Sequence, residues 1–152
     1  MKTTLQLFLE ISEKIKNNHE SSGSVVLVKS GRLSILKKML EESAEIWMAC
    51  KFEDDEQKAL EISQFVYYVI LFCIQAQMKN ETIHSLLSGF ETEITGSKTD
   101  RPNKELIYLT TDLTSDHLSE NERIEKIQEI FSVLNNLISS NNLTKTDIYK
   151  KL

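Results

Sequence analysis

The chain has 152 residues, of which 40% are hydrophobic and 27% charged, with four glycines, one proline and a net charge of −5. This length suits one compact domain with its own core and is too short for two large ones. Few glycines and prolines favour a helical globular protein over a disordered or all-β one. The acidic balance argues against a nucleic-acid partner, because no basic surplus is available to neutralise phosphates.

The N-terminal segment does not have the pattern of a signal peptide, because Gln6 and Glu10 interrupt its apolar residues and no small-residue cleavage site follows. The longest apolar run, residues 65–74, is well below the roughly 20 residues that a membrane-spanning helix needs. We interpret this run as a core helix and expect no membrane partner. Cys50 and Cys73 lack metal-site spacing, so we expect two buried, reduced thiols in a cytoplasmic protein, although a disulfide between them stays open.

Apolar residues at helical spacing predict a first amphipathic helix over residues 2–17. Residues 19–31 contain two glycines, several serines and a β-branched run, which indicate a long loop with at most a short turn of helix. Further helices are expected over these ranges: 32–51, 56–77, 80–88, 103–116, 120–140 and 144–152.

The predicted organisation is all-α, with a helical domain over residues 1–88 and a linker over 89–103 that holds the other two glycines and the proline. The C-terminal helices, 104–152, are expected to pack on the apolar helix of the first unit and complete a pseudo-symmetric bundle. Homodimer or pseudo-dimer formation through this helix packing is therefore expected.

A weak internal repeat links the two helical sets at one constant offset in residue number. It pairs Phe65 with Ile130, Val66 with Phe131, Val69 with Leu134, Cys73 with Ile138, Met78 with Leu143, Ile83 with Ile148, and Leu87 with Leu152. The alternative is that any two amphipathic helix pairs of similar length can be aligned in this way. At this offset the repeat does not carry the acidic residues, because Glu61 falls on Lys126 and Glu41 on Leu106.

The predicted helix 32–51 carries one arc of charged residues: Lys38, Glu41, Glu42 and Glu45. The following helix places Glu61 and Gln64 at i, i+3 spacing. Two such helices packed antiparallel can bring several carboxylates and one amide oxygen together, and oxygen ligands are those that Mg²⁺ prefers.

Each charged or aromatic feature also has a simpler interpretation. The glutamates can form a solvated helix face, and Lys38 can simply pair with Glu41 or Glu42. Met39, Trp47 and Met48 are expected in the core. The histidines, which have no ligand spacing, are expected at the surface: His19, His84 and His117. Asp112 and Asp116 stand at i, i+4 and can mimic the acidic motif, but we expect them on an exposed helix face.

Taken with the upstream segment, the acidic motifs resemble the phosphoribosyl-ATP pyrophosphohydrolase family of the all-α, MazG-like nucleoside triphosphate pyrophosphohydrolase superfamily. The family pattern S-Y-T-x-x-L-x-x-x-G is similar to residues 22–31, and G-x-x-x-I-x-x-K-x-x-E-E-x-x-E is similar to residues 31–45. The pattern E-x-x-D-L-x-Y-H is similar to residues 61–68. Gly23, Gln64 and Tyr68 depart from it, standing where the family has tyrosine, aspartate and histidine. The resemblance covers about residues 5–88.

The resemblance implies a four-helix-type bundle, the second step of histidine biosynthesis, and an active site built in a homodimer or larger assembly. It implies that Mg²⁺, or Mn²⁺, is held by four residues: Glu42, Glu45, Glu61 and Gln64. The residues expected to face the substrate phosphates are Ser22, Ser24, Lys29, Gly31 and Lys38. Glu41 or Glu45 is the expected general base.

We therefore expect a Mg²⁺-dependent pyrophosphohydrolase that cleaves phosphoribosyl-ATP or another nucleoside triphosphate between the α and β phosphates. Gln64 keeps one ligand oxygen but lacks the negative charge of an aspartate, which should weaken metal binding. The alternative is a catalytically weakened relative that binds a nucleotide or a protein partner.

Overall fold

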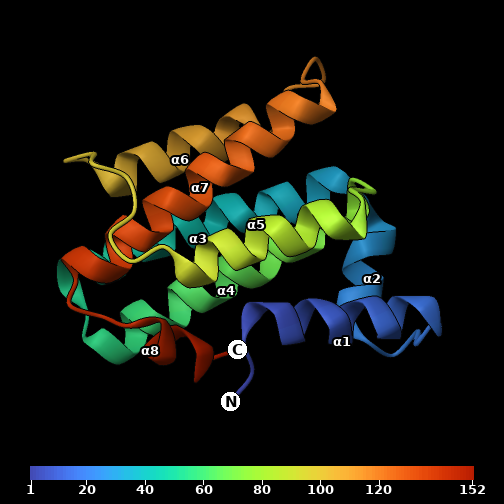
Figure 1. The fold of residues 1–152 in the computed structure, drawn as a ribbon, viewed down its shortest axis with the longest axis horizontal. Coiled ribbons are helices and arrows are strands. Elements are labelled where there is room, and N and C mark those ends of the chain that lie inside the picture. Colours follow the sequence, from blue (N-terminus) through green and yellow to red (C-terminus); the bar gives the residue numbers. More distant parts are fainter.

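The computed structural model describes residues 1–152 and contains eight helices and no strand, which confirms the all-α prediction (Figure 1). The helices are α1 (Thr4–Lys16), α2 (Gly23–Ser30), α3 (Arg32–Phe52), α4 (Asp55–Gln75), α5 (Asn80–Thr92), α6 (Pro102–Asp112), α7 (Glu120–Ser140) and α8 (Lys145–Tyr149).

Side-chain caps determine where several helices begin. A side chain accepts a hydrogen bond from the first turn of α1 at Thr3, of α4 at Asp54, of α7 at Ser119 and of α8 at Thr144. Such caps satisfy backbone N–H groups that have no partner within the helix. Helix α6 begins instead with Pro102, whose missing N–H costs nothing at a first helical position.

Helix α4 is the core of the molecule and packs against α1, α2, α3 and α8. Its residues between Phe65 and Cys73 are almost all buried, as the apolar run predicted. By length and composition alone α4 is apolar enough to cross a membrane, but 61% of its most apolar stretch is buried inside the protein. Neighbouring helices therefore supply the cover that such a helix requires.

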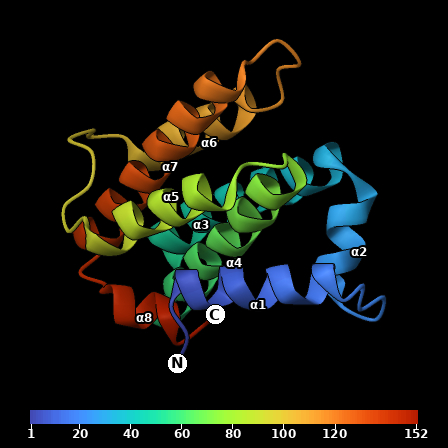
Figure 2. The same ribbon diagram turned by 45° about the vertical axis from the view of Figure 1, so that its right-hand side comes forward.

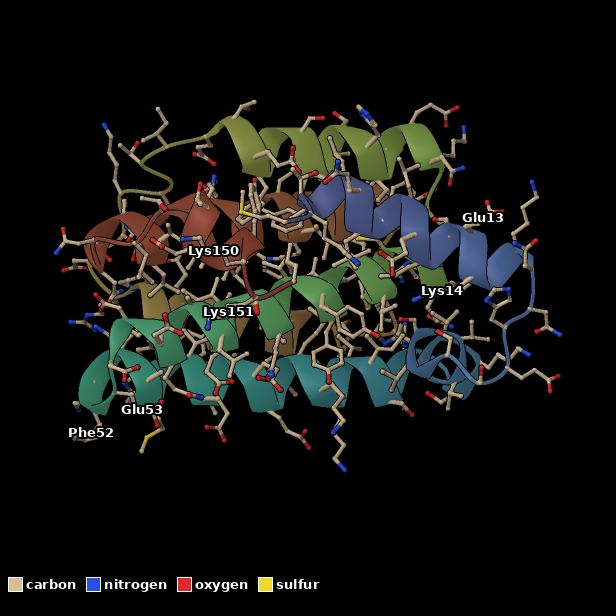
Figure 3. The ribbon with its side chains drawn as sticks, turned by 90° about the horizontal axis from the view of Figure 1, so that it is seen from below. Glu13, Lys14, Phe52, Glu53, Lys150 and Lys151 are labelled. Atoms are coloured by element: carbon tan, nitrogen blue, oxygen red, sulfur yellow. The ribbon has the colours of Figure 1, made fainter.

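The α6–α7 hairpin lies on one side of α3 and α5, and α1 and α8 lie on the other (Figures 1 and 2). Helix α8 packs on α4, α6 packs on α3 and α7, and α7 also packs on α5. The later helices thus contact three helices of the first unit rather than α4 alone. Seen from below, Phe52 and Glu53 mark the α3–α4 turn at one end, with Glu13 and Lys14 of α1 at the other (Figure 3).

The prediction of a long loop over residues 19–31 was wrong, because residues 23–30 form α2. Val25 is buried and the helix packs against α1, α3 and α4, so tertiary contacts outweigh the low helix propensity of the β-branched run. Gly31, at φ +100°, ends α2 and lets α3 begin at once.

The prediction that Trp47 and Met48 lie in the core was also wrong. Their side chains are 48% and 49% exposed, whereas Met39 is fully buried as expected. The buried face of α3 includes Ile35, Met39 and Ile46, and Trp47 and Met48 lie outside it.

The segment between α5 and α6, predicted as a linker, is bonded to α7. Asn136 donates to the carbonyl oxygens of Ser97 and Thr99 at 2.6 and 3.0 Å, and the Ser97 N–H donates to the Ser132 carbonyl at 3.0 Å. Gly96, at φ +71°, lies so close to the α7 main chain that a Cβ atom would overlap it. The segment therefore has a fixed course.

Candidate functional site

Packing of α3 on α4 brings two carboxylates, Glu42 and Glu61, into hydrogen-bonding range. The Glu61 residue is only 7% exposed, and one of its carboxylate oxygens accepts a hydrogen bond from Gln57 one turn earlier. The Oε2 atom of Glu42 is buried and has no hydrogen-bond partner. A buried carboxylate beside a half-buried one is unfavourable when both are ionised, since neither then carries a proton to share.

The pKa of Glu42 is raised from 4.5 to about 7. The first cause is burial, followed by the hydrogen bond to Glu61 and by the negative charges of Glu61, Glu45 and Glu41. Near neutral pH this pair therefore attracts either a proton or a cation.

Tyr68 of α4 lies near Glu42, and Tyr67 packs against Tyr68. Burial and the charge of Glu42 raise the pKa of Tyr68. The Tyr67 ring packs edge-on against Tyr68, and its hydroxyl lies 2.7 Å from the Ser24 hydroxyl, which fastens α2 to α4. The tyrosine at 68, where the family pattern has histidine, thus still borders the acidic pair.

Of the four predicted metal ligands, the structure brings Glu42 and Glu61 together, while Glu45 and Gln64 are exposed one turn further along their helices. No three histidine, cysteine, aspartate or glutamate side chains are grouped closely enough to hold a metal ion. The expected convergence of Glu42, Glu45 and Glu61 is therefore a pair, because the α3 face toward α4 includes Glu42 but not Glu45.

The predicted substrate-binding residues lie along α2 and the start of α3. Ser22 precedes α2 without making a cap hydrogen bond, and Ser24 is buried against Tyr67. Lys29 donates to Asn18 at 2.6 Å, and Lys38 lies 3.4 Å from Glu41, the simple ion pair that the sequence left open. Gly31 forms the junction between the two helices.

Two side-chain contacts of these helices were not predicted. Gln57 orients Glu61, and its i, i+4 spacing to Glu61 is a signal that the sequence contains. The Ser24–Tyr67 bond joins residues 43 positions apart, so helix periodicity gives no indication of it.

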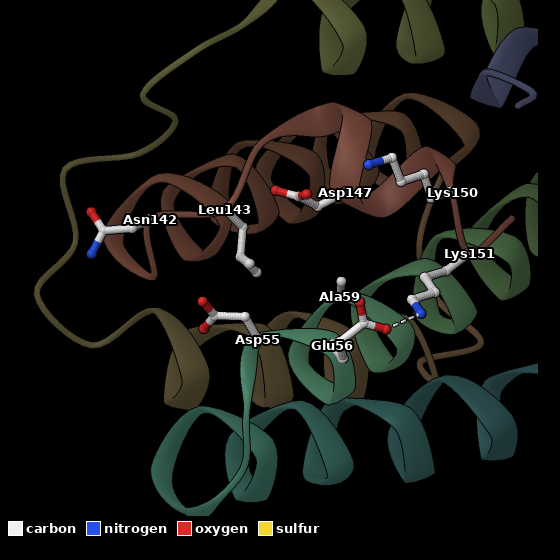
Figure 4. Close-up of a pocket in the computed structure, with 8 residues that line it drawn as sticks. All are labelled: Asp55, Glu56, Ala59, Asn142, Leu143, Asp147, Lys150 and Lys151. Carbon is white, nitrogen blue, oxygen red and sulfur yellow. Dashed lines mark hydrogen bonds and ion pairs between the residues drawn. The ribbon is translucent and has the colours of Figure 1, made fainter.

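The clearest cavities lie elsewhere. One of about 190 Å³ opens between the start of α4 and α8, where Lys151 pairs with Glu56 (Figure 4). Another of about 580 Å³ lies where α3 meets the start of α6, between Trp47 and Tyr108. Neither cavity is lined by Glu42 or Glu61.

The donor chemistry of the pair fits a hard divalent cation. Both groups are oxygen donors of negative charge, and the Glu42 Oε2 atom has no donor within the protein. A cation would offset the negative charges that, after burial, contribute to the raised pKa of Glu42.

A phosphoribosyl-ATP pyrophosphatase from Salinibacter ruber (strain DSM 13855 / M31) is 36% identical to this chain over 87 residues. The alignment covers 57% of this chain and 100% of that protein. No family model matches the chain, and no solved structure does.

Proposed function

The chain belongs to the phosphoribosyl-ATP pyrophosphatase family, and we propose on this basis that it is a nucleotide pyrophosphohydrolase that cleaves between the α and β phosphates and releases pyrophosphate. The substrate is phosphoribosyl-ATP or another nucleoside triphosphate. The observation that carries the proposal is the Glu42–Glu61 pair, with its buried oxygen lacking a hydrogen-bond partner, on the two helices that bear the family-like acidic motifs.

Mg²⁺, or Mn²⁺ in its place, would be held by Glu42 and Glu61, with Glu45 and Gln64 completing the ligand set. When bound, such an ion offsets charge on phosphate oxygens and makes water a better nucleophile near neutral pH. Gln57 keeps the Glu61 carboxylate oriented toward Glu42.

Glu45 is the better candidate for the general base. Glu41 lies 3.4 Å from Lys38 and 3.9 Å from Lys37, whereas Glu45 makes none of the ion pairs in the structure. A free carboxylate oxygen of Glu45 would accept the proton of the attacking water.

Lys38 and Lys29 would face the substrate phosphates, together with Ser22 and the backbone at Gly31. Lys38 is half-exposed and can turn from Glu41 to a phosphate, which carries more charge. Ser24 has a different role, because its hydroxyl is hydrogen-bonded to the Tyr67 hydroxyl. It positions α2 rather than contacting substrate.

A catalytically weakened protein that binds a nucleotide or a protein partner is the second candidate. It is favoured by the neutral Gln64 in place of an aspartate and by the absence of a group of three acidic side chains.

The proposal is tested by measuring pyrophosphate release with Mg²⁺ from a panel of nucleotides that includes phosphoribosyl-ATP. We expect turnover by the unaltered chain and a loss of roughly a hundredfold or more in Glu42→Gln and Glu61→Gln. Glu53→Gln, which removes an exposed carboxylate at the end of α3, is the matched control and should retain activity. Absence of turnover on every substrate would favour the weakened relative.

A further inference from the structure

Helices α4 and α7 share their length and the way they begin and end. Both helices have 21 residues, and each begins after a side-chain cap, Asp54 or Ser119; the two caps are related by the same offset that pairs the apolar positions of the repeat. Each helix is followed by a residue with positive φ, Gln77 at +58° and Asn142 at +59°, again at that offset. The next amide closes the same backbone bond in both, to the carbonyls of Cys73 and Ile138 at 3.2 and 2.9 Å.

The buried positions recur at the same offset. In α4 and α7 the pairs buried in both are Ile62 and Ile127, Phe65 and Ile130, Val66 and Phe131, Val69 and Leu134, Ile70 and Asn135, Phe72 and Leu137, and Cys73 and Ile138. Two amphipathic helices slid into register would share a buried stripe but not these caps and the left-handed turn as well.

The packing between the two sets is reciprocal. Helix α5 packs on α7 while α8 packs on α4, and α3 and α6, the helices that precede α4 and α7, pack on each other. Their first residues, Arg32 and Pro102, define the offset between α3 and α6. At that offset, Trp47 corresponds to residue 117 and Pro102 corresponds to Arg32. Trp47 and Pro102 line one cavity, and Arg32 forms an ion pair with Asp116, which precedes residue 117 in the chain. Reciprocal contacts of this kind are the signature of a two-fold arrangement.

We infer that residues 32–92 and 102–152 are two copies of one three-helix unit related by an approximate two-fold axis. In the second copy, the ammonium group of Lys126 lies where the first copy has the acidic site, and it serves there as a counter-ion within the chain. Lys126 is the counterpart of Glu61 at the offset that relates α7 to α4. Asp112 is the counterpart of Glu42 at the offset that relates α6 to α3, and it lies 3.3 Å from Lys126. The two offsets, taken from where the helices begin, thus predict the contact between Asp112 and Lys126 that the structure contains.

The two pairs therefore differ in the sign of the charge at one position. Glu42 and Glu61 are both acidic and need a cation from outside, whereas Asp112 has the Lys126 ammonium on its own chain. The second unit keeps the shape of the first but has no place for an exchangeable cation. The chain should thus bind one divalent ion and not two.

The test counts Mn²⁺ ions bound by the full chain, using the metal alone and electron paramagnetic resonance of the free ion. Lys126→Glu leaves Asp112, the new carboxylate and Glu129, the counterpart of Gln64, on facing helices. We expect one ion for the unaltered chain and for the control Lys126→Gln, and two for Lys126→Glu. The inference would be overturned if Lys126→Glu bound no more ions than the unaltered chain.

Only the count for the unaltered chain rests on the proposed function. No ion in the unaltered chain but one in Lys126→Glu would reject the proposed metal site and support the inference.

If Lys126→Glu does not fold, the reverse substitution, Glu61→Lys in the first unit, tests the inference. Glu61→Lys should create an ion pair with Glu42, lose Mn²⁺ binding and melt a few degrees above Glu61→Gln in the presence of a chelator. Melting of Glu61→Lys below Glu61→Gln would show that an ammonium does not satisfy this position, and would overturn the inference.

Discussion

At the scale of single residues, the environments of Glu42 and Glu45 differ although both belong to one predicted acidic arc. The spacing of the glutamates identified the candidates, but it gives angles about the α3 axis and not the direction of the neighbouring helix. Helix α4 lies on the side of Ile35, Met39 and Ile46, which is adjacent to Glu42 and turned away from Glu45. Burial and a charged neighbour therefore act on one glutamate far more than on the other.

Glu42 should make the stability of the metal-free protein depend on pH. Its folded pKa of about 7 lies above the ordinary 4.5, so its stabilising protonation is fully present below about 4.5 and lost as pH rises through 7. In chelator, the free energy of unfolding should fall between about pH 5 and pH 8 by about 1 kcal/mol more than in Glu42→Gln, a value reduced for partial exposure. Urea unfolding curves measure this. Parallel pH profiles for the two proteins would contradict it.

Gln64→Asp should strengthen metal binding. A carboxylate adds a negative charge beside the Glu42–Glu61 pair, and we expect the Kd for Mn²⁺ to fall roughly tenfold. Gln128→Asp makes the same change at an exposed position of α7 and should leave the Kd unchanged. If Gln64→Asp leaves it unchanged too, the amide already serves as a ligand or the ion binds elsewhere.

At the scale of elements, local signals placed most helices to within a few residues. Polar caps, the acidic first turn of α4 and the proline of α6 are visible in the sequence. Helix α2 was missed because its helicity depends on packing against α1, α3 and α4. The segment after α5 was recognised as a connection, but the asparagine and serine of α7 that bind it are about 35 to 40 positions away.

Gly96→Ala should be severely destabilising. Its Cβ would overlap the main chain at Ser132 and Asn136, neither of which can move as a flexible side chain would, and φ is +71°. We expect a loss of about 2 kcal/mol or more in thermal or urea unfolding. Gly89→Ala, in the exposed last turn of α5 with free space around it, should gain up to about 1 kcal/mol. Similar stabilities for the two variants would mean that the segment is not held against α7.

At the scale of the whole molecule, the second helical set covers surfaces that would otherwise face water. Leu36 of α3 is buried on a helix that α6 covers, and Phe90 of α5 is buried with its ring against Phe131 of α7. The weak sequence repeat suggested a second unit, but it did not show that each unit's last helix crosses to the other. This crossing of the last helices depends on the path of the segment between α5 and α6, which is bonded to α7.

Truncation after Thr92 should therefore produce a protein that self-associates. Its newly exposed apolar surface on α3, α4 and α5 favours dimers or aggregates, whereas the full chain should be monomeric. Light scattering coupled to size exclusion measures both masses. A soluble monomeric fragment with the melting temperature of the full chain would show that the later helices do not serve as cover.

The crossed packing of α5 on α7 and of α8 on α4 also determines how the chain comes apart. Neither half can open without breaking contacts of the other, so heat should melt both in a single cooperative transition, and amide hydrogens in α4 and α7 should exchange at similar rates. One half can therefore lose its acidic site during evolution, but it cannot lose its fold without unfolding the other half.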